Sequence, residues 1–81
     1  MAWFVYCLYN LSRNYLYVGL TNNPRRRMEQ HNSGKERTTR PYRPFRLLYI
    51  EEFTSRQEAR KREKYLKGGS GKIFLRRLTD S

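Results

Sequence analysis

Two tyrosine-bearing apolar segments near the start of the chain constrain its fold more than any other feature. Residues 2–9 and 15–20 are rich in aromatic and aliphatic side chains, and a short polar stretch separates them. This composition favours β-strands, and the short separation predicts a tight turn that makes the two strands neighbours. The simplest role for Tyr6 and Tyr17, one on each strand, is to fill a half-buried sheet surface.

The remaining chain predicts a helix, a third strand and two further helices. Asn23 and Pro24 form an N-cap and a first helical residue, and Ser55 three residues before Glu58 forms a capping box. At 81 residues the chain has room for one small core, so we expect a single domain, residues 1–81. After the first two strands, the expected elements are a helix over residues 25–32, a strand over residues 46–53, a helix from Ser55 to about Lys67, and a short helix over residues 72–78 that follows a flexible glycine turn.

Positive charge dominates the composition. Eighteen Lys and Arg residues against seven Asp and Glu residues give a formal net charge of +11, and most of the eighteen are arginines. A surplus of this size in a small domain favours a polyanion as partner. The planar guanidinium matches phosphate oxygens better than an ammonium does, so the composition indicates nucleic acid. Structural RNA-binding proteins share this charge profile, so charge alone predicts a partner and not an activity.

The first two helices direct charged side chains toward the body of the protein. At helical spacing from Met28, the one large apolar residue of the first helix, Arg27 and His31 face inward. On the second helix, Glu63 lies between two apolar residues, where a core leucine would be expected. An inward carboxylate on one helix and an inward Arg/His pair on another indicate a shared pocket. The alternative is that a neighbouring arginine neutralises Glu63 in a structural ion pair.

A basic loop joins the first helix to the third strand. Its cations alternate with hydroxyl-bearing side chains, and Pro41 and Pro44 stiffen it and bar a helix. Arginines and hydroxyl donors commonly contact phosphate, so we interpret the loop as a clamp on a phosphate backbone; a solvated surface loop is the alternative. The predicted nucleic-acid-binding residues are Lys35, Arg37, Arg40, Arg43 and Arg46.

The sequence lacks the residues that several other function classes require. Cys7, the single cysteine, is expected in the core, and no Cys/His cluster could hold structural zinc. The apolar start is too short to span a membrane and has no secretory pattern, so we expect a cytoplasmic protein without membrane association. Residues 68–72 do not form a phosphate-binding P-loop, because their glycine and lysine spacing differs from that motif and Ile73 follows Lys72.

Four segments in the right order resemble the motifs of the GIY-YIG nuclease superfamily, over nearly the whole chain. The chain looks most like small stand-alone bacterial members that are similar to the amino-terminal nuclease domain of the excision-repair endonuclease. The first triplet departs from the family pattern, because Phe4 stands in place of the glycine that names it. The matching segments are Phe4-Val5-Tyr6, Tyr17-Val18-Gly19-Leu20-Thr21, residues 27–34 (RMEQHNSG) and residues 58–67 (EARKREKYLK).

The resemblance implies a fold and an activity. The implied fold is a small α/β (α+β) domain, a three-stranded antiparallel sheet flanked by helices in the order β-β-α-β-α-α. The implied activity is that of a metal-dependent endonuclease that hydrolyses DNA phosphodiester bonds, as in DNA repair, with one divalent ion, Mg²⁺ or Mn²⁺. The chain shows no appended DNA-binding module, so a protein partner is expected to supply targeting.

The resemblance also implies five catalytic residues. Tyr6 matches the tyrosine that acts as, or helps orient, the base for the attacking water. Tyr17 matches the second tyrosine near the scissile phosphate, and Arg27 matches the arginine that stabilises charge on that phosphate. Glu63 matches the single carboxylate that binds the metal. His31 matches a position that assists the site in some family members.

Two questions stay open at this level. An unperturbed phenol has a pKa of about 10 and is only about 0.1 % ionised at pH 7, so Tyr6 as base would need positive charge nearby. His31 titrates near neutrality and is the alternative base. For the whole chain, the alternatives to an endonuclease are a catalytically inactive basic module that binds nucleic acid and a small RNA-binding protein.

Overall fold

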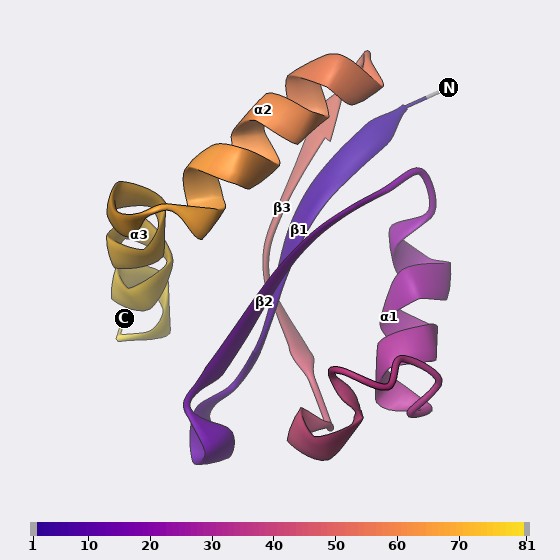
Figure 1. Ribbon diagram of the computed structural model, residues 1–81, viewed down its shortest axis with the longest axis vertical. Helices are drawn as coiled ribbons and strands as arrows, with labels where there is room; N and C mark the ends of the chain where they lie inside the picture. The colour runs from indigo at the N-terminus through magenta and orange to yellow at the C-terminus, as the bar shows by residue number, and fades with distance from the viewer. Residues whose placement is uncertain (1, 81) are drawn as a thin grey trace.

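The chain folds into a three-stranded antiparallel sheet with helices on both faces (Figure 1). The structure is a computed structural model that describes residues 2–80. The predicted α+β class and the order β-β-α-β-α-α are confirmed. The strands are β1 (Trp3–Asn10), β2 (Tyr15–Thr21) and β3 (Arg46–Phe53); the helices are α1 (Pro24–Asn32), α2 (Arg56–Lys67) and α3 (Gly69–Thr79); and the connections contain the 3₁₀ turns η1 (Leu11–Arg13) and η2 (Arg40–Tyr42).

β1 is the central strand of the sheet, which has the order β2-β1-β3. The pairing of β1 with β3 changes register between Cys7 and Leu8. The pairing of β1 with β2 is regular, with Tyr6 opposite Gly19 and Leu8 opposite Tyr17. Residues that lie opposite each other on paired strands project to the same face of the sheet. Tyr6 and Tyr17 therefore share one face.

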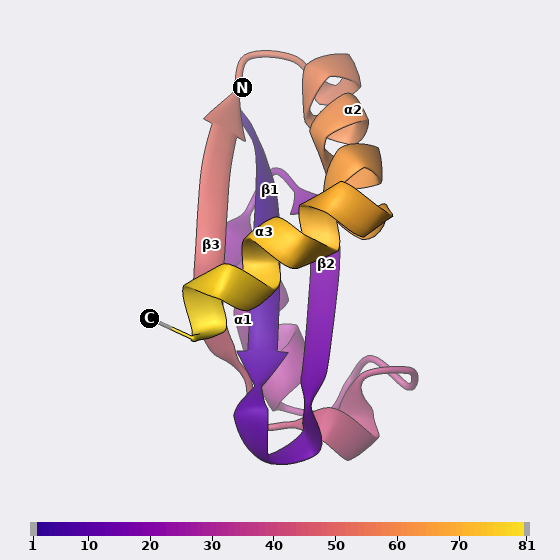
Figure 2. The ribbon, with the colours of Figure 1, turned by 90° about the vertical axis from the view of Figure 1, so that its left-hand side faces the viewer.

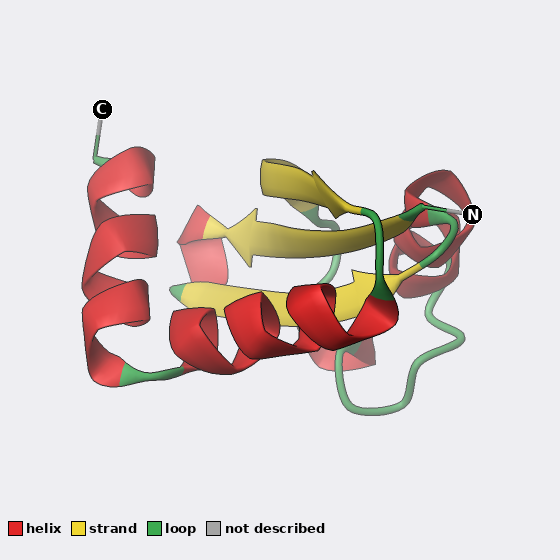
Figure 3. Cartoon of the chain, turned by 90° about the horizontal axis from the view of Figure 1, so that it is seen from above, coloured by secondary structure: helices red, strands yellow, loops and turns green. Residues whose placement is uncertain are grey.

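The two faces of the sheet carry different helix layers (Figures 1 and 3). α1 covers the face of Tyr6, and Met28 of this helix packs against the apolar cluster there. α2 and α3 cover the opposite face, and Cys7 is buried in that layer, as predicted. Among residues 2–80, no helix is both long enough and apolar enough to cross a membrane. The buried residues between the sheet and α2 and α3 are Val5, Cys7, Val18, Ala59, Leu66 and Leu75.

The helices begin at the capping residues that the sequence predicts. The Asn23 side chain accepts a hydrogen bond from the Arg26 N–H at 3.2 Å, and Pro24 lies in the first turn of α1. The Ser55 side chain accepts a hydrogen bond from the Glu58 N–H at 3.2 Å and caps α2. These caps satisfy backbone donors that the helix itself leaves without partners. They therefore fix where each helix starts relative to the sheet.

The last helix is longer than the sequence predicts. We expected a flexible turn before a helix over residues 72–78, but α3 begins at Gly69, directly after α2, and crosses the sheet (Figure 2). Glycine is a weak helix former, so packing must compensate for it. A Cβ on Gly71 would collide with the backbone of Tyr65 and Leu66 in α2. Because Gly71 has no side chain, the first turn of α3 lies directly against α2, and this contact offsets the low helix propensity.

We expect Gly71→Ala to destabilise the protein, with Gly69→Ala as its control. The added methyl group at position 71 meets the α2 backbone and forces the two helices apart, which should lower the free energy of unfolding by about 1–3 kcal/mol. No atom lies within 4 Å of a Cβ on Gly69, so the same change there should be neutral or slightly stabilising. Urea denaturation measures both effects, and equal stability of the two variants would contradict the packing argument.

Candidate active site

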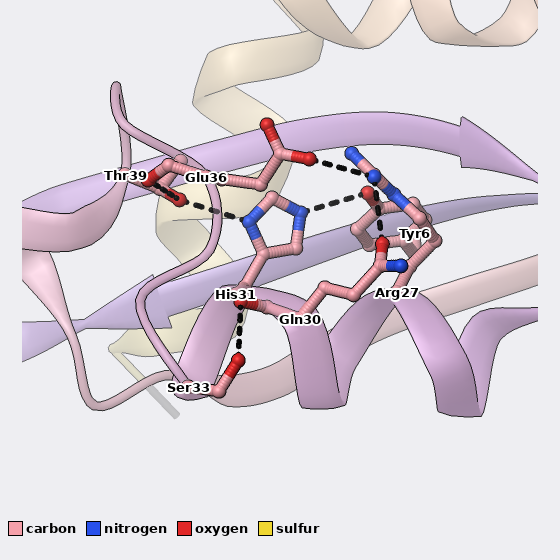
Figure 4. Close-up of polar contacts among 7 residues, drawn as sticks. All are labelled: Tyr6, Arg27, Gln30, His31, Ser33, Glu36 and Thr39. Atoms are coloured by element: carbon pink, nitrogen blue, oxygen red, sulfur yellow. Dashed lines mark hydrogen bonds and ion pairs between the residues drawn. The ribbon is translucent and has the colours of Figure 1, made fainter.

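A buried chain of hydrogen bonds links three polar side chains on the α1 face of the sheet (Figure 4). The Tyr6 hydroxyl of β1 lies 3.1 Å from Nε2 of His31 on α1. Nδ1 of His31 lies 2.9 Å from the hydroxyl of Thr39, in the loop before β3. Tyr6 is only 2 % exposed, and His31 and Thr39 are fully buried. Because buried polar groups cost free energy unless they are hydrogen-bonded, this chain holds all three side chains in place.

Thr39 sets the direction of these hydrogen bonds. Its hydroxyl donates to the carbonyl oxygen of Glu36 at 3.4 Å. The hydroxyl oxygen then acts as the acceptor for the imidazole, so we infer that Nδ1 of His31 carries the proton and donates. In a neutral imidazole Nε2 is consequently an acceptor, and the Tyr6 hydroxyl donates to it. The network thus directs a basic nitrogen of His31 at the phenolic proton of Tyr6.

Burial disfavours the charged forms of both Tyr6 and His31. It raises the pKa of Tyr6 to about 12, although the Arg27 guanidinium acts in the opposite direction. It also lowers the pKa of His31 below the ordinary value of 6.5; the charge of Arg27 adds to this effect, and Glu36 opposes it. At neutral pH, Tyr6 is therefore a phenol and His31 is a neutral imidazole. A free phenolate is not the resting form of this site.

Arg27 extends from α1 beside Tyr6, and two oxygen acceptors orient it (Figure 4). Its Nη1 donates to Oε1 of Glu36 at 2.8 Å and to Oε1 of Gln30 at 2.9 Å. Burial acts to lower the pKa of Arg27, but the contacts with Tyr6 and Glu36 outweigh it and raise that pKa, so the guanidinium stays charged. A guanidinium has five N–H donors, and both of these contacts use one nitrogen. Arg27 therefore keeps donors for an anion such as phosphate.

Tyr17 completes the aromatic surroundings of His31. Its ring centre lies 4.7 Å from that of His31 and 6.1 Å from that of Tyr6, and its side chain is half-buried. Gly19 lies opposite Tyr6, and a Cβ at this position would collide with the Tyr6 ring and hydroxyl. The glycine thus leaves the space that the Tyr6 phenol occupies.

A polar hollow lies beside Arg27, where β2 leads into α1. Its volume is about 470 Å³. Its walls, all within the described part of the chain, combine two arginines with neutral hydrogen-bonding side chains and include no carboxylate. Such a lining suits an anion. The lining residues are Thr21, Asn22, Asn23, Arg26, Arg27 and Gln30.

Glu63 lies apart from this group. It belongs to α2, in the helix layer on the opposite face of the sheet, and is 7 % exposed (Figure 1). Its carboxylate oxygens form ion pairs with Nη1 of Arg60 at 3.4 Å and with Nζ of Lys67 at 3.3 Å. No hydrogen bond or ion pair within residues 2–80 joins Glu63 to the residues around His31. Because α1 and α2 cover opposite faces, the inward residues of the two helices do not form one hydrogen-bonded pocket, and the alternative of a structural ion pair describes these contacts.

The metal ion that the family resemblance implies finds one candidate carboxylate. Within the described residues there is no group of three or more His, Cys, Asp and Glu side chains that could hold a metal ion. Mg²⁺ is often held by one or two carboxylates, with water and substrate phosphates completing its shell. The oxygens of Glu63 therefore suit Mg²⁺ or Mn²⁺ in kind, provided that the ion replaces Arg60 and Lys67 as their partner.

The five predicted nucleic-acid-binding residues are all exposed, but their side chains are held differently. Nε of Arg40 donates to the Gly34 carbonyl at 2.7 Å, and the Arg43 guanidinium occupies the space where a Cβ on Gly34 would lie. Pro41, which we expected to bar a helix, lies in the first turn of η2, where a missing N–H is tolerated. Arg40 and Arg43 thus brace the loop. The other three cations, which extend from the same segment of the chain, are Lys35, Arg37 and Arg46.

The sequence analysis missed three residues that the structure places in the site. Glu36 orients Arg27, and its isolation among the basic residues of this loop was a usable signal. Gln30 also orients Arg27 and follows it by three residues, which is helical contact spacing. Thr39 orients His31 from a separate loop, and no periodic pattern connects a loop residue with a helix. The loop conformation decides that contact.

Known proteins resemble this chain in sequence and in fold. The family model described as the GIY-YIG catalytic domain matches residues 2–77. A UPF0213 protein of Desulfotalea psychrophila is 44 % identical over 68 residues, which are 82 % of this chain and 61 % of that protein. A UPF0213 protein of Staphylococcus haemolyticus is 44 % identical over 68 residues, which are 83 % of each chain. The chain spans only about three fifths of the length of several such relatives.

A solved structure supports the same relationship. The solution NMR structure of a UPF0213 protein from Bacillus halodurans is 34 % identical to this chain and superposes with a TM-score of 0.58. The match covers 96 % of this chain and 85 % of the other. Because the family model spans nearly the whole chain and a relative shares its fold, this chain belongs to the GIY-YIG catalytic domain family, a family of nuclease type.

Proposed function

We propose that this chain is a metal-dependent endonuclease that hydrolyses DNA phosphodiester bonds. The observation that carries the proposal is the 3.1 Å hydrogen bond between Tyr6 and His31, with Arg27 beside it. Phosphodiester hydrolysis needs a group that takes a proton from water and a positive group that stabilises the phosphate oxygens. Tyr6 together with His31 suits the first role, and Arg27 suits the second.

The proton passes from water to Tyr6 and from Tyr6 to His31. Water attacks phosphorus in line with the departing oxygen; one O–H bond of the water breaks and its proton goes to the phenolic oxygen. The phenolic proton passes to Nε2 of His31 in the same step, so no free phenolate forms. The bond from phosphorus to the leaving oxygen breaks, and that oxygen takes a proton from solvent. Thr39, the acceptor for Nδ1, stabilises the imidazolium that results.

Arg27 stabilises the negative charge that develops on the phosphate. Gln30 and Glu36 hold its Nη1, which leaves its other donors for the non-bridging oxygens. The polar hollow of about 470 Å³ beside Arg27 gives the phosphate a place to bind. Tyr17, half-buried next to His31, supplies a further hydroxyl on the same face of the sheet.

Glu63 is the residue that would hold the divalent ion, with water and substrate phosphate as further ligands. When bound, Mg²⁺ or Mn²⁺ neutralises charge on the phosphate and on the leaving oxygen. The chain itself contributes a carboxylate that is 7 % exposed and has cationic partners on its own helix. Those cations keep Glu63 ionised and therefore able to bind a metal ion.

We expect Tyr6→Phe and His31→Gln each to lower the cleavage rate by about 10²–10⁴-fold, because each breaks the proton transfer. Tyr65→Phe is the matched control, since Tyr65 is 48 % exposed on α2 and its hydroxyl lies outside the site. The assay measures cleavage of supercoiled, single-stranded and branched DNA, and of RNA, with Mg²⁺ or Mn²⁺. Activity that survives both site substitutions would show that another group, or a contaminant, cuts the substrate.

The pH dependence of cleavage distinguishes the two candidate bases. His31 must be neutral to accept a proton and its pKa is lowered, so the rate should be flat from pH 7 to 9 and fall only below about pH 6.5. If Tyr6, with its pKa of about 12, acted as a free phenolate, the rate would rise about tenfold per pH unit across that range. Single-turnover rates at saturating substrate provide the measurement.

A basic nucleic-acid-binding module without catalysis is the second candidate function. The ion pairs of Glu63 with Arg60 and Lys67 favour it, because they describe a structural role for that carboxylate. For the endonuclease, Glu63→Gln should abolish metal-dependent cleavage and leave the affinity for DNA within about threefold. For the binding module, no chain cleaves, and DNA binding simply weakens with salt. Cleavage by Glu63→Gln at the normal rate would exclude this carboxylate as the metal ligand.

A further inference from the structure

A second hollow, of about 610 Å³, lies at the end of the sheet where the β1–β2 hairpin turns. One wall is formed by residues 9–13 and the other by residues 43–46, which lead into β3. This hollow shares no residue with the hydrogen-bonded group around His31. From Tyr6 to Asn10, at its edge, β1 extends over about 13 Å. The hollow is therefore a separate site on the same strand.

Local contacts hold the two walls together before any ligand binds. The Asn10 side chain accepts a hydrogen bond from the Arg13 N–H at 3.3 Å and donates to the Tyr42 carbonyl at 2.7 Å. Tyr42 stacks on Tyr15, with ring centres 3.9 Å apart and planes 4° apart. A single side chain thus ties the hairpin turn to the loop, and a ring stack reinforces the connection.

The lining offers groups for both halves of a nucleotide. Arg13 and Arg46 are exposed, and neither forms an ion pair with a carboxylate of the described residues. Leu11 is 60 % exposed, Pro44 is exposed and Tyr9 is half-buried, so apolar surface lies next to these cations. Guanidinium groups bind phosphate, and exposed apolar or aromatic side chains accept the face of a base.

We propose that this hollow binds one nucleotide of a single-stranded segment, with its phosphate on Arg13 and Arg46 and its base against Leu11 and Pro44. A duplex offers phosphates but keeps its base faces stacked, which would leave the apolar wall without a partner. The biological role rests on the proposed function: about 13 Å along β1 corresponds to about four nucleotides of a B-form strand. The hollow then holds the substrate strand on one side of the cut, and the substrate class is DNA with a single-stranded segment there.

Binding of a fluorescein-labelled octathymidylate to the Tyr6→Phe chain tests this site without any need for cleavage. The double variant Arg13→Ala/Arg46→Ala should weaken binding by about tenfold or more, with a shallower salt dependence. Lys61→Ala/Arg77→Ala removes the same charge from α2 and α3 and should weaken binding by less than about threefold. Leu11→Ser should weaken binding of the octathymidylate by about threefold and leave binding of an octamer duplex unchanged.

The outcomes separate this site from the proposed catalysis. If Arg13→Ala/Arg46→Ala binds the octathymidylate like Lys61→Ala/Arg77→Ala, the nucleotide site is wrong, even if the unmodified chain cleaves DNA. If the two site variants weaken binding while the unmodified chain cleaves nothing, the nucleotide site stands and the endonuclease proposal fails. An equal effect of Leu11→Ser on duplex and single strand would overturn the single-strand assignment. Urea denaturation confirms that each variant is folded.

Discussion

The close approach of Tyr6 to Gly19 is the contact on which the α1 face of this structure depends. Tyr6 belongs to the central strand, and its side chain lies over the backbone of β2 because Gly19, directly opposite, has no Cβ. Glycine in the interior of a strand normally weakens the sheet. Here it lets the phenol lie low enough on the sheet to reach Nε2 of His31 on α1. The position of α1 above the sheet is matched to that hydroxyl.

Burial makes this pair neutral at rest and reactive in combination. The same loss of solvent raises the pKa of Tyr6 and lowers that of His31, so neither group carries charge before a substrate binds. Moving the phenolic proton to the imidazole would create charge in a poorly solvated place, which is costly in isolation. A bound phosphate changes this balance, because its negative charge stabilises an imidazolium nearby. Proton transfer therefore becomes favourable when the substrate is present, which suits a site that must not titrate on its own.

Local signals made the elements of the fold predictable from the sequence. Asn23, Ser55 and the alternation around Tyr6 mark the helix starts and strands through contacts between near neighbours in the chain. The start of α3 was not predictable, because glycine propensity argues against a helix at Gly69 and only the packing of Gly71 on α2 outweighs it. In this case a tertiary contact overrides local preference. The candidate site was predictable to the same extent and for the same reason. Helical spacing shows that Arg27 and His31 face inward, and the structure places both beside Tyr6. Spacing on one helix does not tell which face of the sheet that helix covers, so the sequence could not separate Glu63 from them. Nor could it find Thr39, whose contact with His31 exists only because the loop folds back over α1.

The charges of this chain divide into two groups with different physical roles. Arg27 and Arg62 pair with Glu36 and Glu51, and Arg40 is held by a backbone carbonyl. These contacts remove side-chain freedom from arginines that need fixed positions. With a net charge of +11, the other cations lack enough acidic partners and repel one another, which weakens the folded state. A bound polyanion relieves that repulsion as it is recognised, so in this chain binding of nucleic acid and stability of the fold are coupled through the same arginines.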